Sequence, residues 1–433
     1  GPDGKPAVRL YRICQPPQEA WPEAPLATFS DEVALRSVDI PLRAGRDAPL
    51  RVGIRWQPLR AVQGERFFAL HMVDAQGVRW AQTDESGYLT PEWRPGDQVW
   101  QWLEVPTGPE LPPGKYHVRL ILAGEKAAPL PVRNAQGTPV GLYVEAGQVT
   151  LSGEPRWVGT PRPQAPRLGP LWLRAWTPVS AALQPGASLL ADVTWQLVES
   201  APAPLEVRLA LRPSAAGSET QTAQWRFPLA QGYPVTGWQP QEIVRQRYLL
   251  RLPPDVPQGE YTLDLSLDGH EGAVSLGEVR VEGVARLMSP PPMGHPFPEP
   301  YTVGTQAELL GFSLEEWDGQ PEQPLQLTLY WRAVAAFPGD AVVFVHLLDE
   351  EGQIVAQQDV APDSGARPTT GWLGGEVIVD RHTLAPAQPL APGRYRLAVG
   401  LYDPTTLARY ELRSASGERI ADDRLILAEV EVR

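Results

Sequence analysis

Three tryptophans each end a short alternating run of this 433-residue chain, and a common pattern follows each of them. They are Trp56, Trp195 and Trp331, spaced 139 and then 136 residues apart. The run from Leu327 to Trp331 shows the alternation, and a period of two residues places successive side chains on opposite faces of a β-strand. The spacing therefore predicts one β-unit present three times.

The repeat continues with a second tryptophan and, 23 residues later, a tyrosine that follows a Pro/Gly turn. These marks are Trp93 with Tyr116, Trp238 with Tyr261, and Trp372 with Tyr395. A turn, a tyrosine and then alternating aliphatic residues resemble the tyrosine-corner strand of immunoglobulin-like and fibronectin type III sandwiches. We expect the six tryptophans of the repeat in the cores or at their rims.

Composition agrees with an all-β chain, because its 49 prolines and 39 glycines lie mainly at turns between alternating runs. We predict three tandem immunoglobulin- or fibronectin type III-like β-sandwiches, joined by stiff proline-rich linkers into an elongated rod. The predicted segments are an N-terminal proline-rich segment 1–30, sandwich 31–152, linker 153–170, sandwich 171–284, linker 285–304 and sandwich 305–433. Within the first segment, the run from Val8 to Ile13 is a candidate edge strand.

The second copy departs most from the repeat. The first and third copies keep aspartates 18 and 28 residues after their tryptophan, namely Asp74 and Asp84, and Asp349 and Asp359. We interpret Asp74 and Asp349 as hairpin-turn residues, each followed three residues later by a glycine. The second copy lacks both aspartates, which suggests a spacer.

Candidate catalytic groups are few. His71 and His346 occupy equivalent strand positions, and we interpret them as structural or solvent-facing rather than as metal ligands or bases. Asp380 and His382 lie two apart on a strand, which we interpret as a solvated face. No Ser-His-Asp, metal-ligand or phosphate-loop pattern is present, so we predict no catalytic residue, no metal site and no cofactor.

Charge and hydropathy exclude other classes. The net charge of −13 argues against nucleic-acid binding, which needs a basic stripe. The longest strongly apolar run, residues 341–345, is far too short to span a bilayer. Gly1-Pro2 matches the pair that a common engineered protease site leaves, so we expect a piece of a longer protein.

Three tryptophans outside the repeat are the candidate ligand-binding residues: Trp80, Trp100 and Trp102. Trp100 and Trp102 are two residues apart, so they share one face of a strand. Exposed side by side, they would form a platform on which sugar rings stack. The alternative is that they cover an interface with the N-terminal segment or with the second sandwich.

The third copy carries a further resemblance through Leu329-Tyr330-Trp331-Arg332, Val345-His346-Leu347-Leu348-Asp349 and Pro392-Gly393-Arg394-Tyr395. This pattern resembles extracytoplasmic β-sandwich modules at the C-terminal end of bacterial membrane glycosyltransferases of the protein mannosyltransferase type. The match is good over residues 305–432, moderate over 34–150 and poor over 170–283. It implies an extracytoplasmic location and an accessory role. It implies no transferase activity, because the many-helix catalytic portion of such enzymes is absent from this sequence.

We therefore expect a non-enzymatic, extracytoplasmic accessory or spacer region of a bacterial envelope protein, associated with a membrane glycosyltransferase. One alternative is a carbohydrate-binding module that uses exposed tryptophans. Another is a surface-layer or filament subunit that self-associates through sheet edges. The expected partners are a glycan or an envelope protein, with contact to a membrane only through a missing part of the parent protein.

Overall fold

The computed structural model describes residues 24–433, except 63, 86–89, 125–128, 138, 161, 216–221, 231 and 387. The candidate edge strand at Val8 to Ile13 lies outside the described residues. The chain divides into two compact units, one formed by residues 1–108 and 115–154 and the other by residues 109–114 and 155–433.

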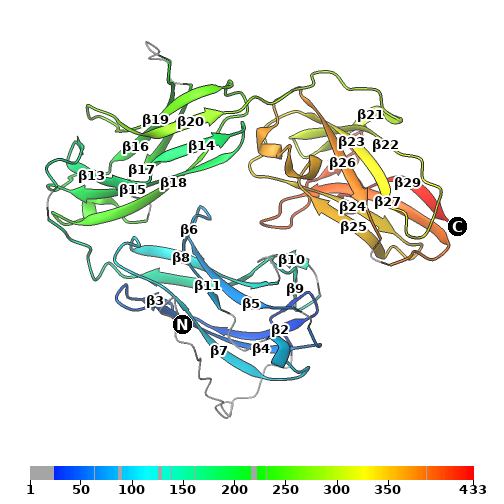
Figure 1. The fold of residues 1–433 in the computed structure, drawn as a ribbon, viewed down its shortest axis with the longest axis horizontal. Helices are drawn as coiled ribbons and strands as arrows, with labels where there is room; N and C mark the ends of the chain where they lie inside the picture. The colour runs from blue at the N-terminus through cyan, green and yellow to red at the C-terminus, as the bar shows by residue number, and fades with distance from the viewer. Residues whose placement is uncertain are drawn as a thin grey trace. The chain divides into compact units, whose positions relative to one another are not determined.

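Two sheets form the first sandwich (Figure 1). The six-stranded sheet has the order β10 (Pro139–Gly141), β9 (Val132–Asn134), β1 (Ala27–Phe29), β2 (Val33–Asp39), β4 (Leu50–Pro58) and β7 (Val99–Val105). The five-stranded sheet has the order β3 (Arg43–Ala44), β11 (Val144–Leu151), β8 (Gly114–Ala123), β5 (Phe67–Val73) and β6 (Arg79–Glu85). The pair β3 and β11 is parallel, whereas β2, β4 and β7 pair antiparallel, as do β5, β6 and β8.

The second sandwich repeats this plan. Its four-stranded sheet has the order β12 (Arg167–Leu168), β13 (Leu171–Trp176), β15 (Ser188–Leu197) and β18 (Ile243–Arg251). Its five-stranded sheet has the order β14 (Val179–Leu183), β20 (Val274–Val281), β19 (Gly259–Leu267), β16 (Glu206–Pro213) and β17 (Ala223–Pro228). Here β14 and β20 form the parallel pair.

The third sandwich also has two sheets. One has the order β26 (Val377–Leu384), β23 (Leu325–Ala333), β22 (Ala307–Leu314), β21 (His295–Val303) and β28 (Leu412–Arg413). The other has the order β25 (Ile354–Val360), β24 (Val342–Leu348), β27 (Gly393–Tyr402) and β29 (Leu425–Val432). The described helices are single 3-10 turns: η1 (Thr90–Glu92), η3 (Val235–Gly237), η4 (Asp363–Gly365), η5 (Thr369–Gly371) and η6 (Ala421–Asp423). The prediction of an all-β fold built from β-sandwiches is confirmed.

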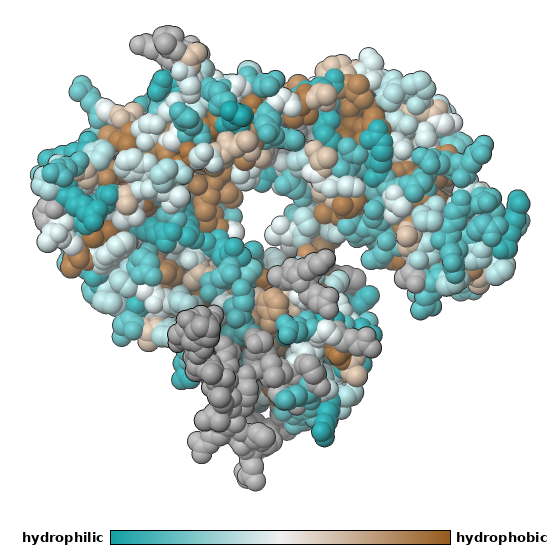
Figure 2. Space-filling view, in the orientation of Figure 1, coloured by the Kyte–Doolittle hydropathy of each residue, from teal (hydrophilic) through white to brown (hydrophobic). Residues whose placement is uncertain are grey.

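The tryptophans of the repeat lie in the cores between the sheets. Trp56, Trp195 and Trp331 have no exposed surface, and each lies on a strand that is paired on both sides. Trp93, Trp238 and Trp372 are also buried and directly follow the turns η1, η3 and η5. Burying such large apolar rings is a main source of stability, which explains why the repeat retains them. On the face drawn in Figure 2, hydrophobic residues form separate patches among hydrophilic ones.

The tyrosines of the repeat are buried as well, and two of them show the hydrogen bond of a tyrosine corner. The Tyr261 hydroxyl donates to the carbonyl oxygen of Pro257 at 2.9 Å, and the Tyr395 hydroxyl donates to that of Ala391 at 2.8 Å. Tyr116 is 3% exposed. The hydroxyl groups of Tyr261 and Tyr395 each fix the turn that precedes their own strand.

Strands extend into segments that the sequence assigned to the N-terminal region and the linkers. β1 lies within 1–30, β12 within 153–170 and β21 within 285–304. β21 contains three prolines, and its register with β22 shifts between Pro296 and Tyr301. A proline lacks the donor that a sheet ladder needs, so this strand pairs on either side of a bulge. Within the described part of the chain, no helix is long and apolar enough to cross a membrane.

Candidate functional site

Trp100 and Trp102 project from β7 on the outward face of its sheet. Their side chains are 44% and 41% exposed, and their ring centroids are 5.6 Å apart with 46° between the planes. Leu103 and Val105 are buried on the inward side of the same strand. Two large apolar rings thus lie next to each other at the surface, where burying them against a ligand would release water.

The register of three strands places specific residues beside each ring. Trp100 is opposite Arg55 on β4, and Arg55 is opposite Ser37 on β2. Trp102 is opposite Gly53, which is opposite Asp39. Cross-strand neighbours lie on the same face of a sheet. Each tryptophan is therefore at one end of a row of three residues that crosses β7, β4 and β2, and the other two residues of each row are polar or small.

Gly53 gives Trp102 the room to lie against the sheet. A Cβ atom built on Gly53 would be 3.1 Å from Cζ3 and 3.2 Å from Cη2 of the Trp102 ring. Those distances are too short for an undisturbed contact, so a side chain here would push the indole away. The ring position therefore depends on a glycine in the neighbouring strand.

Two arginines of β4 flank the rings. The guanidinium carbon of Arg55 is 5.6 Å from the Trp100 centroid, and that of Arg51 is 5.7 Å from the Trp102 centroid. Such cation–π contacts hold aromatic rings in place at a surface. Arg51 is also ion-paired with Glu104 at 3.0 Å. The two indoles are thus part of an ordered array.

A hollow opens beside Trp100. Its volume is about 320 Å³, and it is lined by Ser37, Asp39, Gly53, Arg55 and Trp100. This volume is at the lower end of the ~300–1,000 Å³ typical of small-molecule sites. An aromatic wall, a carboxylate, a guanidinium and a hydroxyl are therefore available to one small ligand. We call the hollow, together with Trp102, the Trp100–Trp102 face.

The corresponding face of the second sandwich carries charges instead of rings. Arg245 and Arg247 stand at the positions of Trp100 and Trp102, and Asp192 stands at that of Gly53. Arg245 Nε donates to Asp192 Oδ1 at 2.7 Å, and Arg247 Nε donates to Asp192 Oδ2 at 3.0 Å. The hydrogen bond with Asp192 raises the pKa of Arg245. One carboxylate is thus hydrogen-bonded to both guanidinium groups.

The corresponding face of the third sandwich is partly covered by its own chain, although Arg381, at the position of Trp102, is exposed. Tyr330 and Val379 stand at the positions of Arg55 and Trp100. Tyr330 forms a small buried cluster with Leu310 and Val377, against which Met293 and Val379 pack. Among the three copies, the first is the one in which exposed rings occupy this face.

Trp80, the third candidate, lies apart from the other two. It is on β6, in the five-stranded sheet, whereas β7 belongs to the six-stranded sheet. Its Nε1 donates to Asp74 Oδ2 at 2.9 Å. Asp74 Oδ1 also accepts hydrogen bonds from the backbone nitrogens of Gln76 and Val78, both at 2.9 Å. Trp80 is thus hydrogen-bonded to a residue of the β5–β6 hairpin turn.

The equivalent histidines have different surroundings. His71 is partly exposed, and burial, with Arg79 nearby, lowers its pKa. His346 is 6% exposed, and its Nε2 is 3.4 Å from Asp359 Oδ1. Asp359 also lies near Tyr402. Burial, followed by the charge of Asp359 and a hydrogen bond with it, raises the pKa of Tyr402 to about 12. His346 therefore belongs to a packed polar cluster on the third sandwich.

The prediction that Asp380 and His382 form a solvated face is wrong. Their side chains have no exposed surface, and His382 Nε2 is 2.9 Å from Asp380 Oδ2 without hydrogen-bond alignment. Asp380 Oδ2 accepts a hydrogen bond from Nε1 of Trp331 at 2.9 Å, and Oδ1 accepts one from the backbone nitrogen of Asp363 at 2.7 Å. The core tryptophan needs a buried acceptor, which turns this carboxylate inward.

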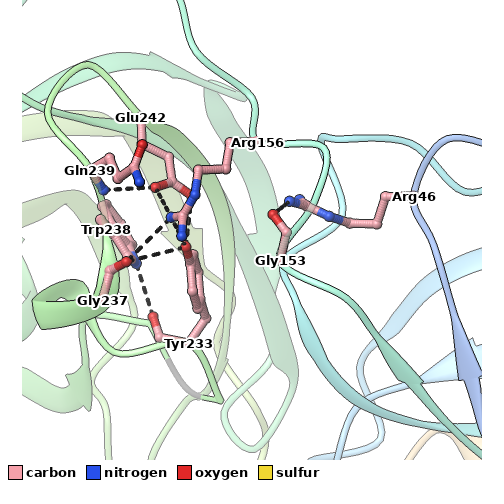
Figure 3. A network of polar contacts seen from close by, with 8 residues as sticks. All are labelled: Arg46, Gly153, Arg156, Tyr233, Gly237, Trp238, Gln239 and Glu242. Atoms are coloured by element: carbon pink, nitrogen blue, oxygen red, sulfur yellow. Dashed lines mark hydrogen bonds and ion pairs between the residues drawn. The ribbon is translucent and has the colours of Figure 1, made fainter.

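Figure 3 shows a second kind of polar network, at the start of the second sandwich. Arg156 Nη1 donates to Glu242 Oε2 at 2.7 Å and to the hydroxyl of Tyr233, also at 2.7 Å. The Tyr233 hydroxyl donates to Glu242 Oε1 at 2.8 Å, and the backbone nitrogen of Gln239 donates to Oε2. In the first unit, Arg46 donates to the carbonyl oxygen of Gly153 at 2.5 Å. These contacts hold chain segments in place and form no open site.

No protein-family model matches the chain, and no curated protein matches it. Among solved structures, the crystal structure of red sea bream transglutaminase is similar over 54% of this chain and 29% of that one, with 10% identity and a TM-score of 0.17. Among the described residues, no group of three or more His, Cys, Asp or Glu side chains is placed to hold a metal ion.

Proposed function

We propose that the chain is a non-catalytic, extracytoplasmic accessory region of a bacterial envelope protein, and that its first sandwich binds glycans. The observation that carries the proposal is the exposed pair of Trp100 and Trp102 beside a polar hollow. The location and the link to an envelope protein come from the sequence resemblance alone.

The chemistry of the Trp100–Trp102 face suits a sugar. A pyranose ring has an apolar face of C–H groups and an edge of hydroxyl groups. The apolar face gains by packing on an indole, which buries surface from water on both sides. The hydroxyl edge needs donors and acceptors, which Arg55, Asp39 and Ser37 supply in the hollow.

The same residues give little support to catalysis. Most glycosidases use two carboxyl groups that flank the scissile bond. Asp39 is the one carboxylate among the described residues that line the hollow. A binding role needs no second acid, and one carboxylate suffices to orient a ligand.

Isothermal titration of the full chain with a panel of soluble oligosaccharides tests the proposal. We expect millimolar-to-micromolar binding of at least one glycan, and loss of that binding in Trp100→Ala and in Trp102→Ala. The matched control is Leu249→Ala, which removes a 42%-exposed apolar side chain from β18, the equivalent strand of the second sandwich. The proposal fails if no glycan binds, or if both tryptophan variants bind as the unchanged chain does.

A further inference from the structure

The hollow beside Trp100 contains one group of each charge. Arg55 contributes a permanent cation and Asp39 contributes a carboxylate, with Ser37 on the same strand as Asp39. Arg55 is opposite Ser37, and Asp39 is opposite Gly53 in the adjacent row. Because Gly53 has no side chain, the carboxylate is the polar group that its row offers to a ligand.

These two groups disfavour charged sugars of either sign. A uronic acid would be attracted by Arg55 and repelled by Asp39, and an amino sugar would meet the reverse, so neither gains a net electrostatic attraction in the hollow. Either ligand charge would still lose hydration on entering the hollow, which costs free energy. A neutral ring carries no such cost and leaves the charges of the hollow balanced.

The two groups also match what a neutral ring offers. An ionised carboxylate accepts hydrogen bonds through two oxygens and donates none. Two hydroxyl groups on adjacent ring carbons can donate to those two oxygens together. Arg55 is a donor without acceptor capacity, so it bonds to the oxygen of a hydroxyl or of the ring. Hydrogen bonds to charged groups are the stronger ones, which makes this pairing specific.

The positions of the rings set the minimum length of the ligand. Trp100 lines the hollow, whereas Trp102 lies over Gly53. The centroids of the two indole rings are 5.6 Å apart. A single sugar in the hollow would pack on Trp100 and leave Trp102 in water. A second linked ring is needed to cover Trp102.

We infer that the Trp100–Trp102 face binds an uncharged oligosaccharide of at least two rings, whose ring in the hollow presents two adjacent hydroxyl groups to Asp39. This inference rests on the proposed function and narrows its ligand to one chemical class.

The test is titration of the full chain with five tetrasaccharides of equal length. Three are neutral, built from glucose, mannose and galactose; one is tetragalacturonate, and one is the glucosamine tetrasaccharide. We expect a neutral tetrasaccharide to bind at least tenfold more tightly than either charged one, and more tightly than its own monosaccharide. Asp39→Asn should weaken that binding at least tenfold.

The matched control is Glu145→Gln, which makes the same change of carboxylate to amide at an exposed residue of β11, in the other sheet. It should bind as the unchanged chain does, and near-ultraviolet circular dichroism should show that Asp39→Asn keeps its tertiary packing. If a charged tetrasaccharide binds best, or if Asp39→Asn leaves binding unchanged, the inference is overturned while glycan binding stands. If nothing binds, the proposed function itself fails.

Discussion

Arg156 and Glu242 form an ion pair, with 2.7 Å between Nη1 and Oε2, although 86 residues separate them. The third sandwich repeats the relationship between Arg286 and Glu376. Both glutamates follow their tryptophan of the repeat, Trp238 or Trp372, by four residues and are almost fully buried. In each case the segment that enters a sandwich is tied to the same turn of that sandwich.

Arg156→Ala should destabilise the second sandwich by about 3 kcal/mol or more, because it leaves the buried carboxylate of Glu242 without its cation. Hydrogen–deuterium exchange of peptides from residues 243–251 measures this locally, which suits a chain with several cooperative units. Arg167→Ala is the control. It removes a pair with Glu199 whose side chains are 52% and 67% exposed, and should cost less than about 1 kcal/mol. Equal effects of the two variants would contradict the prediction.

Gly53→Val should weaken glycan binding at least tenfold without destabilising the first sandwich. The new side chain displaces the Trp102 ring, whereas valine is favoured over glycine in a strand. Gly53→Ala should have a smaller effect on binding, because its Cβ alone meets the ring. Titration with the tightest-binding glycan measures the first quantity, and exchange of β4 peptides measures the second. A Gly53→Val chain that keeps full affinity would show that the ring position does not matter.

Tyr261→Phe should cost about 1 kcal/mol in the second sandwich, because the Pro257 carbonyl loses the hydrogen bond of the tyrosine corner. Tyr395→Phe should do the same in the third sandwich through Ala391. The measurement is exchange of peptides from residues 259–267 and 393–402. Each variant serves as the control of the other, since the untouched sandwich should exchange as before. Uniform loosening of both sandwiches would argue against a local role.

Tyr402 should make the stability of the third sandwich fall between about pH 10 and 12. Burial, followed by the effects of Asp359, raises the pKa of Tyr402 to about 12, so the folded chain keeps the proton that the unfolded chain releases near pH 10. This contribution is complete below pH 10 and is lost as the pH rises towards 12. Tyr402→Phe should reduce the slope of stability against pH in this window. Its absorbance titration at 295 nm should lack one component with a midpoint near pH 12.

Much of the fold could be predicted from the sequence because the repeated positions are those whose side chains are buried. A tryptophan at the end of each alternating run predicted Trp56, Trp195 and Trp331 as core residues, and all three have no exposed surface. The same alternation placed Trp100 and Trp102 on one face of β7, where both are exposed. The alternation of residues within one strand is sufficient to predict which face of that strand a side chain occupies.

The partners of the two rings could not be predicted, because they depend on pairing between distant strands. Ser37 and Asp39 come from β2, and Gly53 and Arg55 come from β4. Trp80 failed to join the others for the same reason, since its strand pairs into the other sheet. One signal was present in the sequence: Gly53 stands where the other copies have Asp192 and Thr328.

Asp380 and His382 show a different limit. They alternate with Val379 and Arg381, so the strand period itself pointed them to the same side as the buried Ile378. The expectation of a solvated face followed residue type instead of position. A carboxylate is rarely buried without a hydrogen-bond partner. Nε1 of Trp331 is the donor that allows Asp380 to be buried, and the types of the neighbouring residues in the sequence do not reveal it.

Gly53, Asp192 and Thr328 stand at equivalent positions of the three sandwiches, on faces that differ in kind. Two rings, an arginine–aspartate cluster and an apolar cover occupy the same outward positions of three copies, and the inward positions remain tryptophan cores throughout. The residues that each sandwich presents to its surroundings therefore differ between the copies, whereas the residues that keep each sandwich folded are shared. Because strand alternation separates the two faces, a few substitutions on adjacent strands can change the outward surface of one sandwich while its buried core stays the same.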